Sequence, residues 1–173
     1  MTRLIFETHS TTVDNERGIA TGWLPGELSE RGRRESRELG SRRRDDVDVV
    51  FSSDLRRAVH TVELAGLDAP HFQDWRLREC SYGKLNGSPV DALEPRVGRV
   101  HTPFPDGQSY TDVLELTRSF LEDVKRWYGA RTVLVVAHSA NRWSFEHLLG
   151  SQAPLEDLLA SPFNWQPGWT YDF

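Results

Sequence analysis

The chain has 173 residues, a formal net charge of -5 and one cysteine, Cys80. This length suits one compact domain with a hydrophobic core, and no linker rich in Pro, Gly or Ser divides it, so we expect a single domain over residues 1–173. One cysteine excludes an intramolecular disulfide and a cysteine-based zinc cluster, which favours a reducing, cytoplasmic location. No apolar run has the length of a signal-peptide core or a membrane span, so we expect no membrane association.

The N-terminal part predicts a strand, a long loop and a helix. An apolar strand over residues 4–8 precedes a loop over residues 9–27, whose glycines and prolines make it too irregular for a helix. Ser29 is expected to cap a helix that runs to about Arg44. This helix is rich in arginine, but acidic residues interleave with the arginines and cancel much of their field. We therefore expect a solvated helix and no nucleic-acid partner.

The middle of the chain predicts a short strand, a helix and an irregular excursion. The strand covers residues 47–51, and the run Ser52-Ser53-Asp54 is expected to cap the following helix. Arg57 then lies just inside the start of that helix, close to the strand tip. Residues 66–107 hold most of the prolines and glycines, so we expect one or two short helices there. The strongest local feature of this excursion is Leu77-Arg78-Glu79.

The C-terminal part returns to regular alternation. An amphipathic helix is predicted from Ser109 to about Tyr128, a buried strand over residues 133–137, a helix over residues 141–149 and a short strand over residues 169–173. Alternating strands and helices predict an α/β fold, a three-layer sandwich with a mostly parallel central sheet flanked by helices.

Two apolar strands at opposite ends of the chain each stop at a His-Ser pair, His9-Ser10 and His138-Ser139. Parallel strand ends border the crevice where open α/β sheets bind ligands, so the two imidazoles are expected to meet there. One neutral imidazole can act as a nucleophile while the second stabilises an anion, which suits a phosphoryl group. Arg57 and Glu79 have the chemistry of an oxyanion donor and an acid. Their alternatives are a surface arginine and a rim carboxylate.

The motifs along the whole chain resemble those of the histidine phosphatase superfamily, which has the phosphoglycerate mutase-like fold. The similarity lies in Thr8-His9-Ser10-Thr11-Thr12, Asn15, Gly22-Trp23, Leu28-Ser29-Glu30-Arg31-Gly32, Ser52 to Thr61, Leu77-Arg78-Glu79 with Gly83 and Gly87, Gly107-Gln108-Ser109, and Val135 to Ser139.

The resemblance implies specific roles for these residues. His9 would be the nucleophile that becomes phosphohistidine, Glu79 the general acid, and Arg57 and His138 the groups that hold the phosphoryl oxygens. No metal and no other cofactor is implied. Further substrate contacts are expected from Thr8, Ser10, Asn15, Gly22, Trp23, Ser139 and Arg142. For Trp23, the alternative is packing beneath its loop.

The first motif departs from the family. This chain has Thr8-His9-Ser10 where the family normally has Arg-His-Gly, so one of the two customary phosphate-binding arginines is missing. A charge-assisted hydrogen bond contributes about 1.5 to 3 kcal/mol, so its absence costs on the order of tenfold to a hundredfold in binding or rate. We expect Arg142, or one of Arg17 and Arg78, to supply the charge. The alternative is that Arg142 is a solvated helix arginine.

The resemblance favours an enzyme that hydrolyses a small phosphomonoester through phosphohistidine. The family's mutases have extra segments that close the pocket, and this chain is too short for them. Two alternatives remain open. One is a ligand-binding module with weakened turnover. The other is an enzyme for a less anionic substrate, with Thr8, Ser10, Thr11 and Thr12 offering hydroxyl groups. The expected partner is a small phosphorylated molecule, and the expected state a monomer or weak homodimer.

Overall fold

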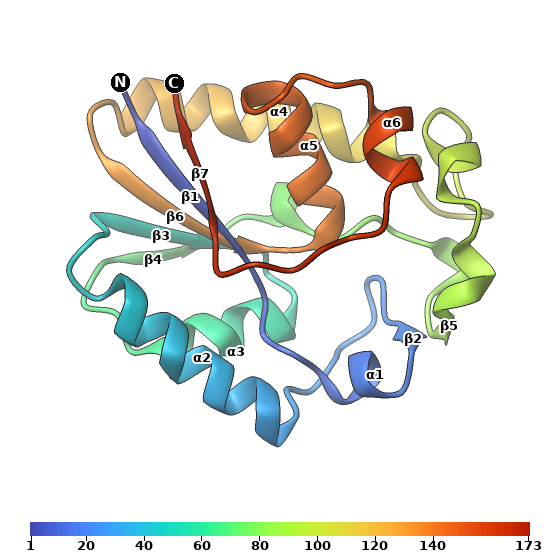
Figure 1. Cartoon of the computed structure of the whole chain (residues 1–173), viewed down its shortest axis with the longest axis horizontal. Coiled ribbons are helices and arrows are strands. Elements are labelled where there is room, and N and C mark those ends of the chain that lie inside the picture. Colours follow the sequence, from blue (N-terminus) through green and yellow to red (C-terminus); the bar gives the residue numbers. More distant parts are fainter.

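A five-stranded sheet with the order β4-β3-β6-β1-β7 forms the centre of the computed structural model, which describes residues 1–173 (Figure 1). The strands are β1 (Arg3–Thr8), β3 (Val49–Ser52), β4 (His71–Gln73), β6 (Thr132–Ala137) and β7 (Trp169–Asp172). Four strands run parallel, and only β7 is antiparallel to its neighbour β1. The expected mostly parallel sheet is therefore confirmed.

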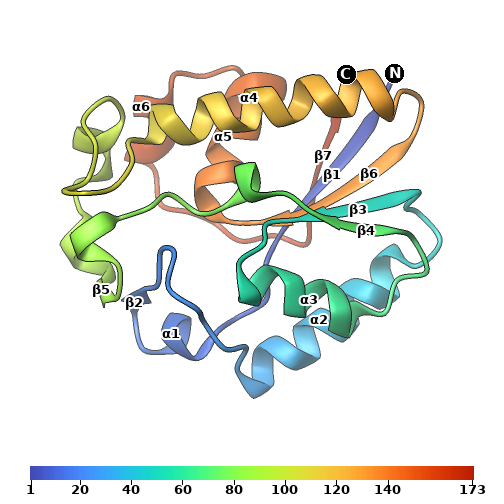
Figure 2. The same cartoon turned by 180° about the vertical axis from the view of Figure 1, so that it is seen from behind.

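Helices cover both faces of this sheet (Figures 1 and 2). On one face lie α2 (Glu30–Arg43) and α3 (Arg56–Ala65), and on the other α4 (Tyr110–Trp127) and α5 (Ser139–Leu149). Smaller elements surround the carboxyl ends of the strands: α1 (Val13–Glu16), β2 (Ile19–Ala20), β5 (Ser88–Pro89), α6 (Leu155–Ala160) and four 3-10 helices, η1 (Trp75–Leu77), η2 (Gly83–Leu85), η3 (Val90–Leu93) and η4 (Arg96–Arg99). None of the helices combines the length and hydropathy of a membrane span.

The alternation of side chains along β1 builds two cores. Phe6 packs with Phe120 and Phe145 on the α4/α5 face, whereas Ile5 packs with Leu39 of α2 on the opposite face. Successive residues of a strand point to opposite sides, so a strand covered by helices on both sides is apolar throughout. This two-sided burial fixes β1 and β6 at the centre of the molecule.

Two local expectations were wrong. The loop over residues 9–27 contains a helix, α1, because Thr12 and Asn15 form a capping box that replaces apolar periodicity as the helix signal. The run Ser52-Ser53-Asp54 does not cap α3, whose N-cap is Leu55 without a side-chain hydrogen bond. The hydroxyl of Ser53 contacts His138 instead.

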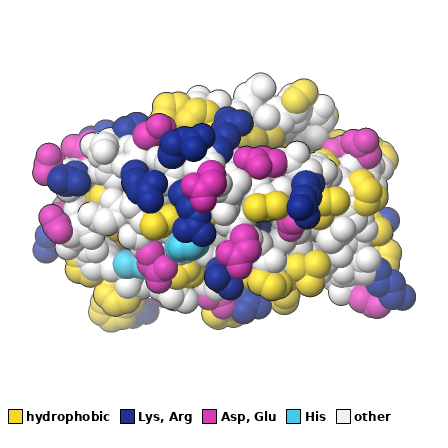
Figure 3. Space-filling view, turned by 90° about the horizontal axis from the view of Figure 1, so that it is seen from below, with side chains coloured by type: hydrophobic (Ala, Val, Ile, Leu, Met, Phe, Trp, Pro, Cys, Tyr) yellow, Lys and Arg dark blue, Asp and Glu magenta, His cyan; other side chains and the backbone are white.

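The arginines of α2 are paired with acidic side chains. Arg31 lies 2.8 Å from Glu35, and Arg33 lies 3.7 Å from Glu30. On the face shown in Figure 3, Lys and Arg side chains likewise alternate with Asp and Glu. The absence of a nucleic-acid partner stays a prediction.

A buried carboxylate connects α2 to the C-terminal segment. Glu7 is 2% exposed and lies 3.0 Å from Arg42 and 2.9 Å from Arg43. Arg43 also donates a hydrogen bond of 3.1 Å to the carbonyl oxygen of Pro167. The two guanidinium groups neutralise Glu7 and hold the segment that leads into β7.

Replacing Arg43 with alanine is expected to lower the free energy of unfolding by about 2 kcal/mol, because Glu7 keeps only one cationic partner in a buried position. Arg44→Ala removes an exposed arginine from the same helix end and is expected to change the free energy of unfolding by less than about 0.5 kcal/mol. Denaturant unfolding measures both values, and equal losses would show that the Glu7 contact contributes nothing specific.

Candidate active site

Parallel pairing of β1 with β6 brings the two strand-end histidines together. Thr8 lies opposite Ala137 in the register, and the backbone N–H of His9 donates to the carbonyl of Ala137 at 2.9 Å. The rings of His9 and His138 have centroids 5.1 Å apart and planes tilted by 52°. The expected meeting of two imidazoles at the end of the sheet is present.

His9 is held in one neutral tautomer. Its Nδ1 lies 2.8 Å from the carbonyl oxygen of Ser10, which can only accept, so Nδ1 carries the proton. Its Nε2 accepts from Nε of Arg57 at 3.3 Å and therefore presents a lone pair. Burial, and secondly the charge of Arg57, lower the pKa of His9 from 6.5 to about 3. A neutral imidazole with an unprotonated Nε2 has the electronic form of a nucleophile.

Arg57 is the cation at this position. It is the second residue of α3 and only 3% exposed. Its Nη2 donates to the carbonyl of Gly22 at 2.8 Å, and its Nη1 contacts the carbonyl of Leu24 at 3.3 Å. Burial lowers the pKa of Arg57, but an arginine remains protonated in proteins. The guanidinium therefore joins the loop after α1 to the His9 imidazole.

His138 lies beneath the surface of the site. It is 0% exposed, and its Nε2 lies 2.6 Å from Oγ of Ser53. His138 is also the N-cap of α5, and its side chain faces the backbone N–H of Asn141 in a capping box. Burial, followed by the charges of Arg57 and His9, holds the pKa of His138 well below its ordinary value. The ring is therefore neutral.

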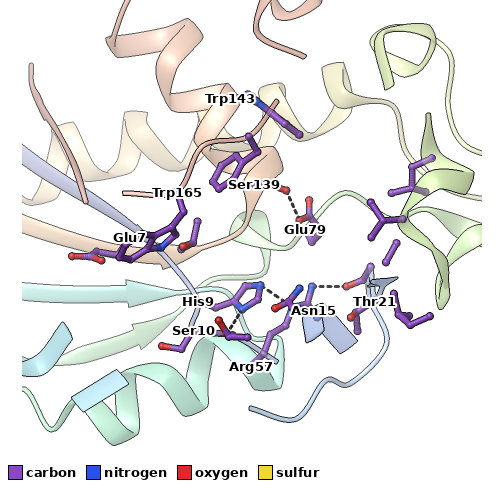
Figure 4. A pocket seen from close by; sticks show the side chains of 18 of the residues that line it. Glu7, His9, Ser10, Asn15, Thr21, Arg57, Glu79, Ser139, Trp143 and Trp165 are labelled. Atoms are coloured by element: carbon purple, nitrogen blue, oxygen red, sulfur yellow. Dashed lines mark hydrogen bonds between the residues drawn. The ribbon is translucent and has the colours of Figure 1, made fainter. Parts of the chain in front are cut away.

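Glu79 is fixed at the start of α5. One carboxylate oxygen accepts from the backbone N–H of Cys80 at 2.8 Å and from that of Ala140 at 3.3 Å. The other accepts from the hydroxyl of Ser139 at 3.0 Å (Figure 4). Glu79 is 7% exposed and faces the same cavity as His9. These contacts hold a carboxyl group where it can exchange a proton with a ligand.

A cavity of about 520 Å³ contains most of the residues expected from the sequence. Its lining includes the candidate residues Thr8, His9, Ser10, Asn15, Gly22, Arg57, Glu79 and Ser139 (Figure 4). Asn15 uses its amide oxygen to accept from the backbone N–H of Thr12, which leaves its amide hydrogens for a ligand. The structure has no group of three or more His, Cys, Asp or Glu residues that could hold a metal ion.

The structure does not bring Arg142 to this site, although it was expected to replace the missing arginine. Arg142 lies 2.8 Å from Glu146, one turn along α5, and its guanidinium stacks over Trp169 at 4.6 Å. Neither alternative replaces it at the cavity wall. Arg78 pairs with Asp54 at 2.7 Å, and Arg17 is exposed outside the cavity. Within this cavity no arginine from the expected set stands in for the absent one.

Trp23 also lies elsewhere than expected. Its indole N–H donates to the backbone carbonyl of Glu79 at 2.6 Å, and its ring packs under Arg78 at 4.8 Å. It does not line the cavity. Trp23 therefore supports the segment that carries Glu79.

Other cavity residues carry no sequence motif that marks them as site residues. Arg96 from η4, Tyr82 and Trp143 form part of the wall, and Trp165 lies at the side near Glu7 (Figure 4). They come from the irregular excursion, from α5 and from the segment before β7. The one available signal was the chemistry of Arg96 itself, an arginine in an apolar and proline-rich stretch.

Comparison with known proteins shows which family has this arrangement. The family model of the histidine phosphatase superfamily (branch 1) matches residues 4–161. A 2,3-bisphosphoglycerate-dependent phosphoglycerate mutase of Tropheryma whipplei is 34% identical over 174 residues, with 80% of this chain and 78% of that protein covered. Phosphoserine phosphatase 1 of Hydrogenobacter thermophilus is 29% identical over 153 residues, covering 80% and 72%. The chain belongs to the histidine phosphatase superfamily.

A solved structure has the same fold as this chain. The YhfR protein of Bacillus stearothermophilus matches with a TM-score of 0.85 over 98% of this chain and 90% of that one, at 23% identity. Matches to some other mutases are shorter: the alignment with the Candida albicans phosphoglycerate mutase covers 38% of that protein. The family resemblance and the phosphoglycerate mutase-like fold expected from the sequence are both confirmed.

The lowered pKa of His9 predicts a loss of stability in acid. Below about pH 6.5 the unfolded state binds a proton at this histidine, whereas the folded state does not until about pH 3, so the free energy of unfolding falls as the pH falls between these values. From about pH 7 to about pH 5 the loss from His9 is about 2 kcal/mol. Denaturant unfolding of the wild type and of His9→Gln at both pH values isolates this contribution, and parallel pH dependences would contradict it.

Proposed function

We propose that this protein hydrolyses a phosphomonoester through a phosphohistidine intermediate on His9. The observation that carries the proposal is the lone pair of His9 Nε2 beside the guanidinium of Arg57, in a cavity that Glu79 also lines. Membership of a superfamily with phosphatases and mutases supports phosphoryl transfer. The reaction class is therefore proposed from the site and the family together.

The first half-reaction transfers the phosphoryl group to the protein. Nε2 of His9 attacks phosphorus, the bond between phosphorus and the ester oxygen breaks, and Glu79 acts as the general acid that gives a proton to the departing alkoxide. Arg57 and His138 bind the non-bridging oxygens, whose negative charge they stabilise. The alcohol leaves as a neutral molecule, and Glu79 is left as a carboxylate.

The second half-reaction regenerates the site. Water attacks phosphorus, Glu79 takes one of its protons, and the bond between phosphorus and Nε2 breaks. Inorganic phosphate is released, and His9 and Glu79 return to their starting protonation states. If an alcohol replaces water as the acceptor, the same steps give a mutase, which is the other activity among the relatives.

The proposal is tested by incubation with a ³²P-labelled phosphomonoester at about pH 7. We expect an acid-labile label on His9 and release of phosphate, with both absent in His9→Gln. Arg57→Ala is expected to lower the labelling rate by about a hundredfold, because a buried donor to the phosphoryl oxygens is lost. Arg142→Ala is the matched control, since Arg142 lies outside the cavity, and is expected to stay within about threefold of wild type.

Three outcomes would contradict the proposal. Ligand binding without label or phosphate release would favour the binding module with weakened turnover. Transfer of the label to a second alcohol, without phosphate release, would favour a mutase. Turnover of a phosphodiester without turnover of a monoester would favour a less anionic substrate, for which the single cavity arginine beside His9 suffices.

We propose in addition that the alcohol of the substrate carries a carboxylate, which Arg96 binds. Arg96 lines the cavity with its side chain 15% exposed, and its Nε is bonded to Glu94 at 2.9 Å. Its Nη1 has only a long contact of 3.5 Å with Tyr110, so guanidinium donors remain for a ligand. Phosphoserine and phosphoglycerate, which the names of the relatives contain, both carry a carboxylate.

Arg96→Gln is expected to raise the KM for phosphoserine by about tenfold, because one charge-assisted hydrogen bond is lost. The KM for p-nitrophenyl phosphate, which has no carboxylate, is expected to stay within about twofold of the wild-type value. Arg99→Gln in the same 3-10 helix is the control, because Arg99 donates to the carbonyl of Pro103 outside the cavity. Steady-state kinetics on both substrates measure the effect. Equal changes for the two substrates would show that Arg96 does not recognise the carboxylate.

Domain organisation, location and assembly remain proposals as well. A single domain over residues 1–173 is supported by the central sheet, in which strands from both ends of the chain are neighbours. A cytoplasmic location is supported by the one buried cysteine, Cys80. The proposed state is a monomer or weak homodimer that binds a small phosphorylated molecule.

A further inference from the structure

Glu35, in the middle of α2, contacts the loop that follows His9. Its Oε2 accepts from the backbone N–H of Thr11 at 2.9 Å, and its Oε1 accepts from the Thr11 hydroxyl at 3.1 Å. Arg31, one turn earlier in α2, donates to Oε1 at 2.8 Å. Two of the three donors to Glu35 thus belong to one loop residue, so the carboxylate fixes that residue against α2.

The N–H that Glu35 binds belongs to the same peptide group as the carbonyl that binds His9. The C=O of Ser10 and the N–H of Thr11 form one planar amide, in which they point in opposite directions. Nδ1 of His9 donates to the Ser10 carbonyl at 2.8 Å, and the N–H of Thr11 donates to Glu35 on the other side. The carboxylate and the imidazole are therefore connected through a single peptide group.

The hydrogen bonds in this connection have a fixed direction, because a backbone N–H donates and carbonyl and carboxylate oxygens accept. A hydrogen bond to a carboxylate is stronger than one between neutral groups, and it polarises the amide, so the Ser10 carbonyl becomes a better acceptor. A better acceptor at Nδ1 holds the ring proton of His9 there. The lone pair at Nε2 then stays beside Arg57.

The preceding peptide group is held by α3. The backbone N–H of Ser10 donates to Oγ1 of Thr61 at 3.0 Å, and the hydroxyl of Thr61 donates to the carbonyl of Arg57 at 2.7 Å. Ser10 and Thr61 are both buried. These contacts fix the N–H of Ser10 but not its carbonyl, which belongs to the next peptide group. That group is held by Glu35 through its N–H.

We propose that Glu35 is a positioning residue that orients the imidazole of His9 through the peptide group between Ser10 and Thr11. The proposal rests on the proposed function for its purpose, because the oriented ring serves as the nucleophile. The hydrogen bonds themselves are a property of the unliganded protein. Two helices then prepare His9: α2 directs its ring proton through Glu35, and α3 places Arg57 beside its lone pair.

The hydrogen bonds of the unliganded protein provide the first test. Long-range ¹H–¹⁵N NMR at about pH 7.5, with the ring assigned by its loss in His9→Gln, is expected to show a protonated Nδ1 and an unprotonated Nε2. Hydrogen exchange is expected to show a Thr11 amide at least about tenfold slower than in an unstructured chain. In Glu35→Ala this protection is expected to disappear, and the ring proton to distribute over both nitrogens.

The wild-type protein alone can overturn the proposal. A protonated Nε2 of His9, or a Thr11 amide that exchanges as fast as in an unstructured chain, would do so even if Glu35→Ala does not fold.

Kinetics of labelling His9 with the ³²P-labelled phosphomonoester provide the second test. Glu35→Ala is expected to slow labelling at saturating substrate by about tenfold, because the nucleophile is no longer held in the orientation for attack. The half-saturating concentration is expected to stay within about threefold of wild type, because Arg57 still binds the phosphoryl group. Glu35→Gln is expected to restore the rate to within about threefold of wild type, since its amide oxygen still accepts the backbone hydrogen bond.

Glu30→Ala is the matched control. Glu30 lies in the same helix, is 87% exposed and pairs with Arg33, and neither residue lines the cavity. This variant is expected to stay within about threefold of wild type. Slowing of Glu35→Ala to no greater extent than Glu30→Ala would overturn the role of Glu35. So would a slowing that Glu35→Gln does not relieve, because the hydrogen bond to Thr11 would then not be its cause.

The possible results separate the two proposals. If the wild-type protein forms no phosphohistidine, the proposed function fails, while NMR and hydrogen exchange of the unliganded protein still support or overturn the connection from Glu35 to His9. A protected Thr11 amide, together with slowing in Glu35→Ala that Glu35→Gln relieves, supports both.

Discussion

The parallel register of three neighbouring strands determines the geometry of the site. Thr8 of β1 lies opposite Ala137 of β6, and Val136 of β6 lies opposite Ser52 of β3, so His9, His138 and Ser53 follow strands that end together. A slip of one residue would turn each side chain to the other face of the sheet. Burial on both faces prevents such a slip, because every residue from Val133 to Ala137 is 0% exposed. The core thus fixes the distance between the imidazoles.

The charges near the strand ends are distributed unevenly. Arg42 and Arg43 lie near β1, the strand that precedes His9, but their guanidinium groups pair with the Glu7 carboxylate. Position 8 holds threonine, so Arg57 is the arginine that reaches the imidazole. The guanidinium of Arg57 is therefore the positive charge beside His9, and hydroxyl groups of the residues around it take the place of a second arginine.

Sequence patterns identified the residues whose position depends on local structure. His9, His138 and Arg57 follow strands or begin helices, so strand and helix signals located them. Arg142 was predicted to lie at the site, but it is four residues from both His138 and Glu146, and its guanidinium pairs with Glu146. Which neighbour it contacts depends on Trp169, which antiparallel β7 brings against α5. Arg96 was not identified because η4 lies in an excursion without periodicity. Its place depends on tertiary packing against Trp143.

The pairing of β1 with β6 joins segments that are far apart in the sequence, since Arg3 lies opposite Thr132. Contacts so distant in sequence form slowly, because closing a long loop must precede any gain from packing. The helices α2 and α3 can pair beforehand through contacts that are local in the sequence. A chain in which β1 and β6 have not yet paired has no paired histidines, so the site forms only when the central sheet is complete.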